Sequence, residues 1–114
     1  MSDRLDEFKK RREALNEKIL ARENVNIKRF FGIDTAAYRS GALDSKTKEL
    51  LGLVASTVLR CDDCITYHLI RCREEGVSDA EMDETMAVAL VVGGSITIPH
   101  LRRAYDLWDD LKKQ

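Results

Sequence analysis

The feature that most constrains the fold of this sequence is its near-complete lack of proline. The 114-residue chain contains one proline, Pro99, and no long run in which β-branched residues alternate with polar ones. Proline breaks the interior of a helix, and alternation is the pattern of a half-buried strand. We therefore predict an all-α fold, a compact bundle of about five to six helices.

The first half of the chain contains three predicted helical segments. Apolar residues at helical spacing indicate an N-terminal helix at about residues 3–23, followed by a short helix with turns at about 25–40. A third helix begins at Asp44 or Ser45, either of which is a plausible N-cap. Its predicted buried face consists of Leu50, Leu51, Val54, Val58 and Leu59.

The second half is marked by capping signals. A helix at about residues 62–75 stops at Gly76, which suits a left-handed C-terminal cap. Ser78 and Glu81 have the spacing of a capping box and open the next helix. Two sets of residues mark the apolar faces of the last two helices, namely Met82, Met86, Ala89 and Leu90, then Leu101, Ala104, Tyr105, Trp108 and Leu111.

Length and charge limit the classes of partner. We expect residues 1–114 to form a single domain, with most recognisable motifs at about 43–111. The formal net charge of −1, from 19 basic and 20 acidic residues, gives no reason to expect binding to nucleic acid or to a membrane.

We expect a cytoplasmic protein, because the start lacks a signal-peptide pattern and no later run is long enough to span a membrane. Three cysteines without a secretory signal favour reduced thiols.

The chemistry is predicted around Cys61, Cys64 and His68, which fall within an arc of roughly 60° on one helical face. A helix N-terminus stabilises a thiolate, which is the reactive form of cysteine. Cysteines three residues apart allow a disulfide to close, so one sulfur can attack a substrate while the other resolves the product. His68, one turn beyond Cys64, could accept or relay a proton. The pattern predicts thiol redox chemistry.

Glu49 joins this site only if the chain reverses direction. On one continuous helix, the separation of twelve positions between Glu49 and Cys61 would span about 18 Å. A turn near Arg60, with antiparallel packing, would place Glu49 level with Arg71 and about one turn from His68. Glu49 could then fix the tautomer of the imidazole and complete a proton path from the thiol.

These residues together resemble the signature of a known family. The spacing of Glu49, the Cys61-x-x-Cys64 pair and His68 is similar to that of the alkyl hydroperoxidase D-like branch of the carboxymuconolactone decarboxylase superfamily. Residues 76–81 and 89–94 are also similar to that family. The resemblance implies an all-helical homo-oligomer, often a trimer or a hexamer. The decarboxylase branch typically lacks the cysteine pair, so a lactone decarboxylase is disfavoured.

The resemblance also implies roles for individual residues. Cys64 would be the peroxidatic cysteine and Cys61 its disulfide partner and proton donor, with Glu49 and His68 as the proton relay. The expected substrate is a hydroperoxide or a disulfide, and the reductant is a dithiol, which in the family includes lipoyl-protein. The chain departs from the best-known hydroperoxidases at Asp63, where they carry a histidine. No cofactor and no metal are expected.

Other interpretations remain open at this stage. A disulfide-exchange or redox-sensing protein, or a non-catalytic oligomeric module, would also fit the cysteine pair. Zinc could be bound by Cys61, Cys64, His68 and Cys72, but one straight helix presents four ligands poorly for tetrahedral geometry. Cys72 is interpreted as a core residue and His100 as a surface or capping residue.

Overall fold

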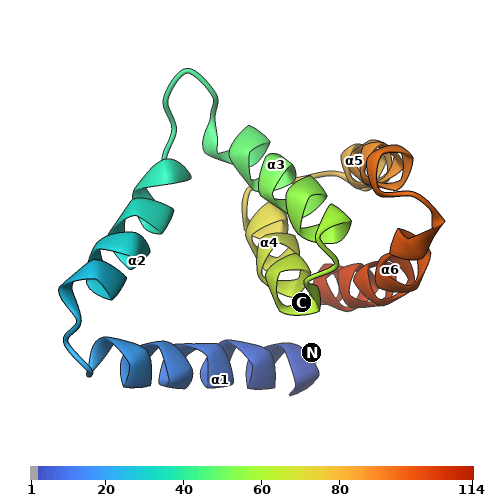
Figure 1. Cartoon of the computed structure of the whole chain (residues 1–114). Coiled ribbons are helices and arrows are strands. Elements are labelled where there is room, and N and C mark those ends of the chain that lie inside the picture. Colours follow the sequence, from blue (N-terminus) through green and yellow to red (C-terminus); the bar gives the residue numbers. More distant parts are fainter. Residues whose placement is uncertain (1–2) are drawn as a thin grey trace. The chain divides into compact units, whose positions relative to one another are not determined.

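The computed structural model describes residues 3–114, and within this range the chain is helical and contains no strand. The helices, shown in Figure 1, are α1 (Asp3–Leu20), α2 (Val25–Ala37), α3 (Ser45–Val58), α4 (Asp62–Glu74), α5 (Asp79–Gly93) and α6 (Ile98–Lys112), with a short 3₁₀ turn at Ser95–Thr97. Six α-helices confirm the predicted all-α class. The chain divides into two compact units, Met1–Arg39 and Ser40–Gln114. The prediction of a single domain stays a prediction.

The first unit contains α1 and α2. Asn24 caps α2, because its side-chain oxygen accepts hydrogen bonds from the backbone N–H groups of Asn26 and Ile27 at 3.0 and 3.1 Å. The preceding residue, Glu23, has a positive φ of 58°, which redirects the chain between the two helices. The second helix is longer and more regular than the short helix with turns that the sequence indicates. It carries Phe30 and Ile33, both 66% exposed.

The second unit contains α3 to α6 and positions the cysteine pair. Helix α3 packs against both α4 and α5, and α4 also packs against α6 (Figure 1). The core of this unit is formed by Leu53, Ile65, Leu69, Ile70, Cys72, Val77, Met82, Met86, Ala89, Ala104, Trp108 and Leu111. The predicted apolar faces of the last two helices are largely confirmed. The N-terminus of α5 is also as predicted, with a reciprocal capping box between Ser78 and Glu81.

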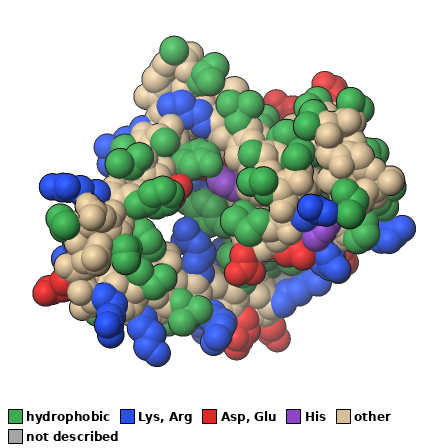
Figure 2. All heavy atoms as spheres, in the orientation of Figure 1, with side chains coloured by type: hydrophobic (Ala, Val, Ile, Leu, Met, Phe, Trp, Pro, Cys, Tyr) green, Lys and Arg blue, Asp and Glu red, His purple; other side chains and the backbone are tan. Residues whose placement is uncertain are grey.

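The predicted buried face of α3 is wrong. Leu51 and Leu59 are 55% and 76% exposed, whereas α3 buries Glu49, Leu53 and Thr57. The polar residues can be buried because they have partners: the Thr57 hydroxyl donates to the Leu53 carbonyl at 2.8 Å, and Glu49 is paired as described below. Figure 2 shows further apolar side chains at the surface, among basic and acidic ones.

Candidate active site

The site begins at the turn between α3 and α4. Arg60 has a positive φ of 60°, a conformation that reverses the chain after α3. Cys61 follows in an extended conformation and is the N-cap of α4, where its sulfur accepts a hydrogen bond from the backbone N–H of Cys64 at 3.3 Å. The reversal near Arg60 is therefore as predicted. It places both cysteines at the positive end of the α4 dipole.

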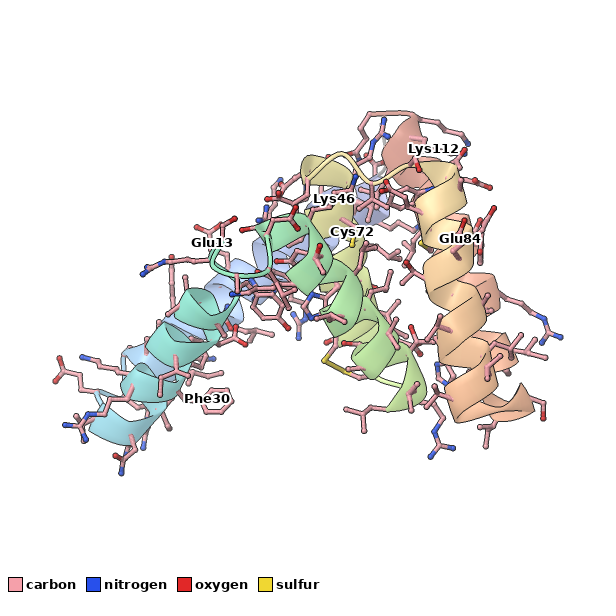
Figure 3. All side chains as sticks on the ribbon, turned by 90° about the horizontal axis from the view of Figure 1, so that it is seen from above. Glu13, Phe30, Lys46, Cys72, Glu84 and Lys112 are labelled. Carbon is pink, nitrogen blue, oxygen red and sulfur yellow. A yellow bond between two sulfur atoms is a disulfide. The ribbon has the colours of Figure 1, made fainter. Side chains whose placement is uncertain are left out.

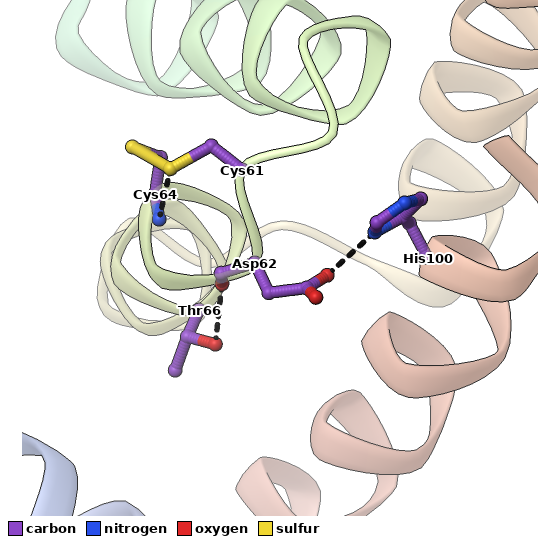
Figure 4. Close-up of a disulfide and its surroundings, with 5 residues drawn as sticks. All are labelled: Cys61, Asp62, Cys64, Thr66 and His100. Atoms are coloured by element: carbon purple, nitrogen blue, oxygen red, sulfur yellow. Dashed lines mark hydrogen bonds and ion pairs between the residues drawn. A yellow bond between two sulfur atoms is a disulfide. The ribbon is translucent and has the colours of Figure 1, made fainter.

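Cys61 and Cys64 are joined by a disulfide, and their Cα atoms lie 5.3 Å apart. Cys64 is exposed, Cys61 is half-buried and the neighbouring Asp63 is exposed. Figure 4 shows the disulfide beside the first turn of α4. The pair is therefore accessible to a substrate or to a reducing partner from solvent.

The predicted contact between Glu49 and His68 is present. Nδ1 of His68 lies 2.8 Å from Oε1 of Glu49, and both residues are buried, at 7% and 1% exposure. The other carboxylate oxygen of Glu49 lies 3.5 Å from Nε of Arg71. Glu49 on α3 thus pairs with His68 and Arg71 of α4, which lie about one helical turn apart.

This arrangement fixes the orientation of the imidazole. A carboxylate accepts hydrogen bonds, so Nδ1 of His68 carries the proton that is donated to Glu49. In the neutral ring the lone pair is then on Nε2, so that nitrogen is the one that can accept a proton. His68 also follows Cys64 by four residues on α4, which places the two side chains on one face. Arg71 was expected to lie level with Glu49, but the ion pair between the two residues was not predicted.

Arg71 links the buried carboxylate to the surface. Its guanidinium also pairs with Glu74 and with Glu75, at 2.5 and 3.0 Å. The hydrogen bond with Glu74 is the largest cause of the raised pKa of Arg71, and the charges of Glu49 and Glu74 add to it. Arg71 therefore stays cationic and supplies a positive charge next to Glu49.

The third cysteine, Cys72, is a core residue, as the sequence indicated. It is fully buried near the C-terminal end of α4, away from the end that carries the disulfide (Figure 3). Burial raises the pKa of its thiol to about 12, and the nearby charge of Glu49 acts in the same direction. Cys72 is thus a neutral thiol at physiological pH and has little nucleophilic character.

His100 is not simply a surface or capping residue. Its Nδ1 atom lies 2.7 Å from Oδ1 of Asp62, and Arg103 binds the other oxygen of Asp62 at 3.1 Å. This cluster connects α6 to the first residue of α4, next to Cys61 (Figure 4). Sequence reasoning missed it because 38 positions separate His100 from Asp62. The only local signal was that His100 and Arg103 are three residues apart on one helix.

Between residues 3 and 114, no three His, Cys, Asp or Glu side chains are grouped as a metal site would require. In the same range, no helix is both long and apolar enough for a membrane crossing.

Comparison with known proteins identifies the family. The model of the carboxymuconolactone decarboxylase family matches residues 27–107. The chain belongs to this family. Its Cys61–Cys64 pair agrees with the alkyl hydroperoxidase D-like branch that the sequence motif indicated. One related protein is "uncharacterized protein 4 in cox locus" of Paracoccus denitrificans. It is 27% identical to this chain over 82 residues, which make up 72% of this chain and 74% of that protein.

Solved structures of family members resemble this chain over 94% or more of its length. A crystal structure of a Thermotoga maritima protein matches with a TM-score of 0.92 and 62% identity, over 94% of each chain. A second crystal structure of that protein, with a TM-score of 0.90 and 61% identity over 94% and 91% of the two chains, describes a carboxymuconolactone decarboxylase family protein with a suggested role in an antioxidative response. A Legionella pneumophila family member has a TM-score of 0.86 at 24% identity over 96% and 98%, which shows the shared fold.

Proposed function

We propose that this carboxymuconolactone decarboxylase family protein is a thiol-dependent oxidoreductase that reduces hydroperoxides through Cys64 and Cys61. The observation that carries the proposal is the buried Glu49–His68 pair, held one helical turn from an exposed cysteine of a closed disulfide. A purely structural disulfide has no need of a histidine whose tautomer is fixed by a buried carboxylate.

The reaction proceeds in three balanced steps. First, His68 takes the Cys64 proton, and the thiolate attacks the outer oxygen of ROOH. The O–O bond breaks, the leaving RO⁻ takes the proton back from His68 and departs as ROH, and Cys64 becomes a sulfenic acid. Second, the Cys61 thiol attacks that sulfur, so the disulfide forms and water leaves. Third, an external dithiol reduces the Cys61–Cys64 disulfide and is itself oxidised to a disulfide.

The surroundings of the pair support this assignment of roles. Cys64 is the more exposed of the two cysteines and lies on the helical face of His68, so it is the better placed to meet a peroxide. Cys61 at the N-cap is close enough to close the bond without moving the helix, with 5.3 Å between the Cα atoms. The suggested antioxidative role of the Thermotoga maritima protein, at 62% identity, points in the same direction.

Cell compartment and assembly are part of the proposal. A cycle that depends on a dithiol donor suits a reducing compartment, so we place the protein in the cytoplasm. We also infer a homo-oligomer of the trimeric or hexameric kind. Its support is the apolar surface of the second unit, where Leu59, Val91 and Val92 are 76%, 84% and 66% exposed.

Intact-mass analysis and thiol counting test the activity. The fully reduced protein is treated with a small excess of an organic hydroperoxide, and any new bond is mapped on peptides. We expect rapid loss of two thiols and a bond between Cys61 and Cys64, and no reaction of Cys64→Ser. Survival of all three thiols would exclude peroxide reduction. If the protein then still catalysed exchange with a dithiol, the disulfide-exchange alternative would be favoured.

A further inference from the structure

The cluster of Asp62, His100 and Arg103 lies directly beside the cysteine pair. Asp62 is the first residue of α4 and follows Cys61 in the chain. Its two carboxylate oxygens are divided between two residues of α6, with Oδ1 at 2.7 Å from Nδ1 of His100 and Oδ2 at 3.1 Å from Arg103. The His100 side chain is 17% exposed, whereas the side chains of Asp62 and Arg103 are 47% and 58% exposed, so the cluster lies at the surface.

The hydrogen-bond pattern gives the direction of each contact. Nδ1 of His100 lies 2.7 Å from the carboxylate and 3.4 Å from Arg103. Both Arg103 and a protonated Nδ1 are donors, and a carboxylate only accepts. Nδ1–H of His100 therefore donates to Asp62, as does Arg103. The negative charge of Asp62 is compensated by Arg103, and also by His100 when that ring is protonated.

The position of this carboxylate matters for a thiol. A negative charge close to a cysteine disfavours its thiolate. Figure 4 shows the Asp62 side chain directed away from the disulfide and toward His100 on α6. Meanwhile the Asp62 carbonyl accepts a hydrogen bond from Thr66 at 2.8 Å, within the first turn of α4. Two contacts from α6 thus hold the acidic group toward α6 and away from the disulfide.

We propose that His100 and Arg103 are positioning residues that act through Asp62, compensating part of its negative charge and holding its carboxylate turned away from Cys61 and Cys64. Neither residue needs to touch a substrate. The inference rests on the proposed function only in that the two cysteines cycle between dithiol and disulfide. Two other charged residues near the pair, Arg60 and Asp63, remain the same in every variant below.

The expected effects have opposite signs. Asp62→Asn removes the negative charge and should lower the pKa of the more acidic thiol of the pair by about half a unit, roughly threefold in thiolate fraction. His100→Ala/Arg103→Ala frees the carboxylate and should raise that pKa by a similar amount. If both residues act through Asp62, the double substitution should have no further effect in an Asp62→Asn background.

Alkylation of the reduced protein by iodoacetamide, followed from about pH 5 to pH 9 and mapped on peptides, measures the thiol pKa. Equilibration with glutathione redox buffers measures the stability of the disulfide. Arg102→Ala is the matched control, since it removes the same charge from the exposed neighbour of Arg103. Circular dichroism confirms folding, and Asp62→Asn, which keeps the shape of the side chain, serves as an independent test if the double variant unfolds.

The results separate this inference from the peroxidase proposal, because neither measurement uses peroxide. Opposite shifts that disappear in the Asp62→Asn background would support the inference, even for a protein that fails to reduce hydroperoxides. An unchanged thiol pKa in Asp62→Asn would overturn it. An equal effect of His100→Ala/Arg103→Ala with and without the Asp62 carboxylate would also overturn it, since those residues would then act by another route.

Discussion

Nδ1 of His68 lies 2.8 Å from Oε1 of Glu49, although 19 positions separate the two residues in the sequence. The contact exists because α3 and α4 form a hairpin around Arg60, which brings the early turns of α3 beside the middle of α4. Glu49 has 1% exposure, so its charge is compensated within the protein, by Arg71 and by His68 when that ring is protonated.

Substitution of Glu49 by Gln tests this relay. The amide oxygen can still accept a hydrogen bond from His68, but the negative charge beside the ring is lost. We expect peroxide-driven formation of the Cys61–Cys64 disulfide to slow by about 10- to 100-fold. Stopped-flow or quenched thiol counting measures the rate. Glu74→Gln is the control, because it removes a 54% exposed partner of Arg71 and should leave the rate nearly unchanged. Equal slowing by both variants would contradict the relay.

Substitution of the two cysteines separates attack from resolution. In Cys61→Ser, Cys64 should react with peroxide and remain as a sulfenic acid, because the resolving thiol is missing. Dimedone labelling and intact mass should then show one modified cysteine, mapped to Cys64. In Cys64→Ser no labelling is expected, since Cys72 is buried and protonated. Labelling of Cys61 in Cys64→Ser, with none in Cys61→Ser, would reverse the two roles.

Much of this architecture follows from local sequence signals. The N-cap of α3 was expected at Asp44 or Ser45 and is Asp44, and the capping box of Ser78 and Glu81 is present as predicted, because such caps depend on residues a few positions apart. The Glu49–His68 contact was predictable for a related reason. Once a turn near Arg60 is assumed, the rise per residue of two packed helices fixes which residues lie level with each other.

The rest depends on contacts between distant segments. Apolar periodicity placed Leu51 and Leu59 in the core, yet α3 buries Glu49 and Thr57. These polar side chains can be buried because Glu49 pairs with His68 and the Thr57 hydroxyl donates to the Leu53 carbonyl, and apolar periodicity takes no account of such partners. The Asp62–His100 contact was missed because its two residues lie on different helices, 38 positions apart. No spacing rule relates the start of α4 to the start of α6.

The buried thiol of Cys72 predicts a dependence of stability on alkaline pH. Its pKa rises from 9.0 to about 12 on folding. The unfolded chain therefore loses this proton at lower pH than the folded chain, so the contribution to stability is complete below about pH 9 and is lost between about pH 9 and pH 12. Between about pH 8 and pH 10 the loss from this group amounts to about 1.4 kcal/mol.

Urea unfolding at several pH values measures this effect. The comparison uses Cys61→Ser/Cys64→Ser, in which Cys72 is the only thiol, with and without Cys72→Ala. The variant that lacks Cys72 should lose about 1.4 kcal/mol less stability over the same interval. Tyr105, whose pKa is raised to about 12 mainly by burial, contributes in both proteins and cancels in the difference. Parallel curves for the two proteins would show that the Cys72 thiol ionises normally.

Gly93 in α5 and Gly32 in α2 both lie in helices, but only Gly93 is closely packed against other residues. A Cβ added at Gly93 would lie 2.5 Å from the Thr97 side chain and 3.6 Å from Val58, whereas a Cβ at Gly32 would meet no atom within 4 Å. Thr97 is fully buried and its hydroxyl donates to the Gly94 carbonyl at 2.8 Å, so it cannot easily move aside.

We therefore expect Gly93→Ala to lower the free energy of unfolding by about 1–3 kcal/mol, because the added methyl group overpacks the contact between α5 and the end of α3. Gly32→Ala should raise that free energy by about 0.4–1 kcal/mol, since alanine restricts the unfolded chain and favours the helix. Chemical denaturation of both variants measures the two changes. A stabilised Gly93→Ala would mean that α5 can shift away from Val58. The end of α3 leads directly into Arg60 and Cys61, so such freedom would also extend to the turn that holds the cysteine pair.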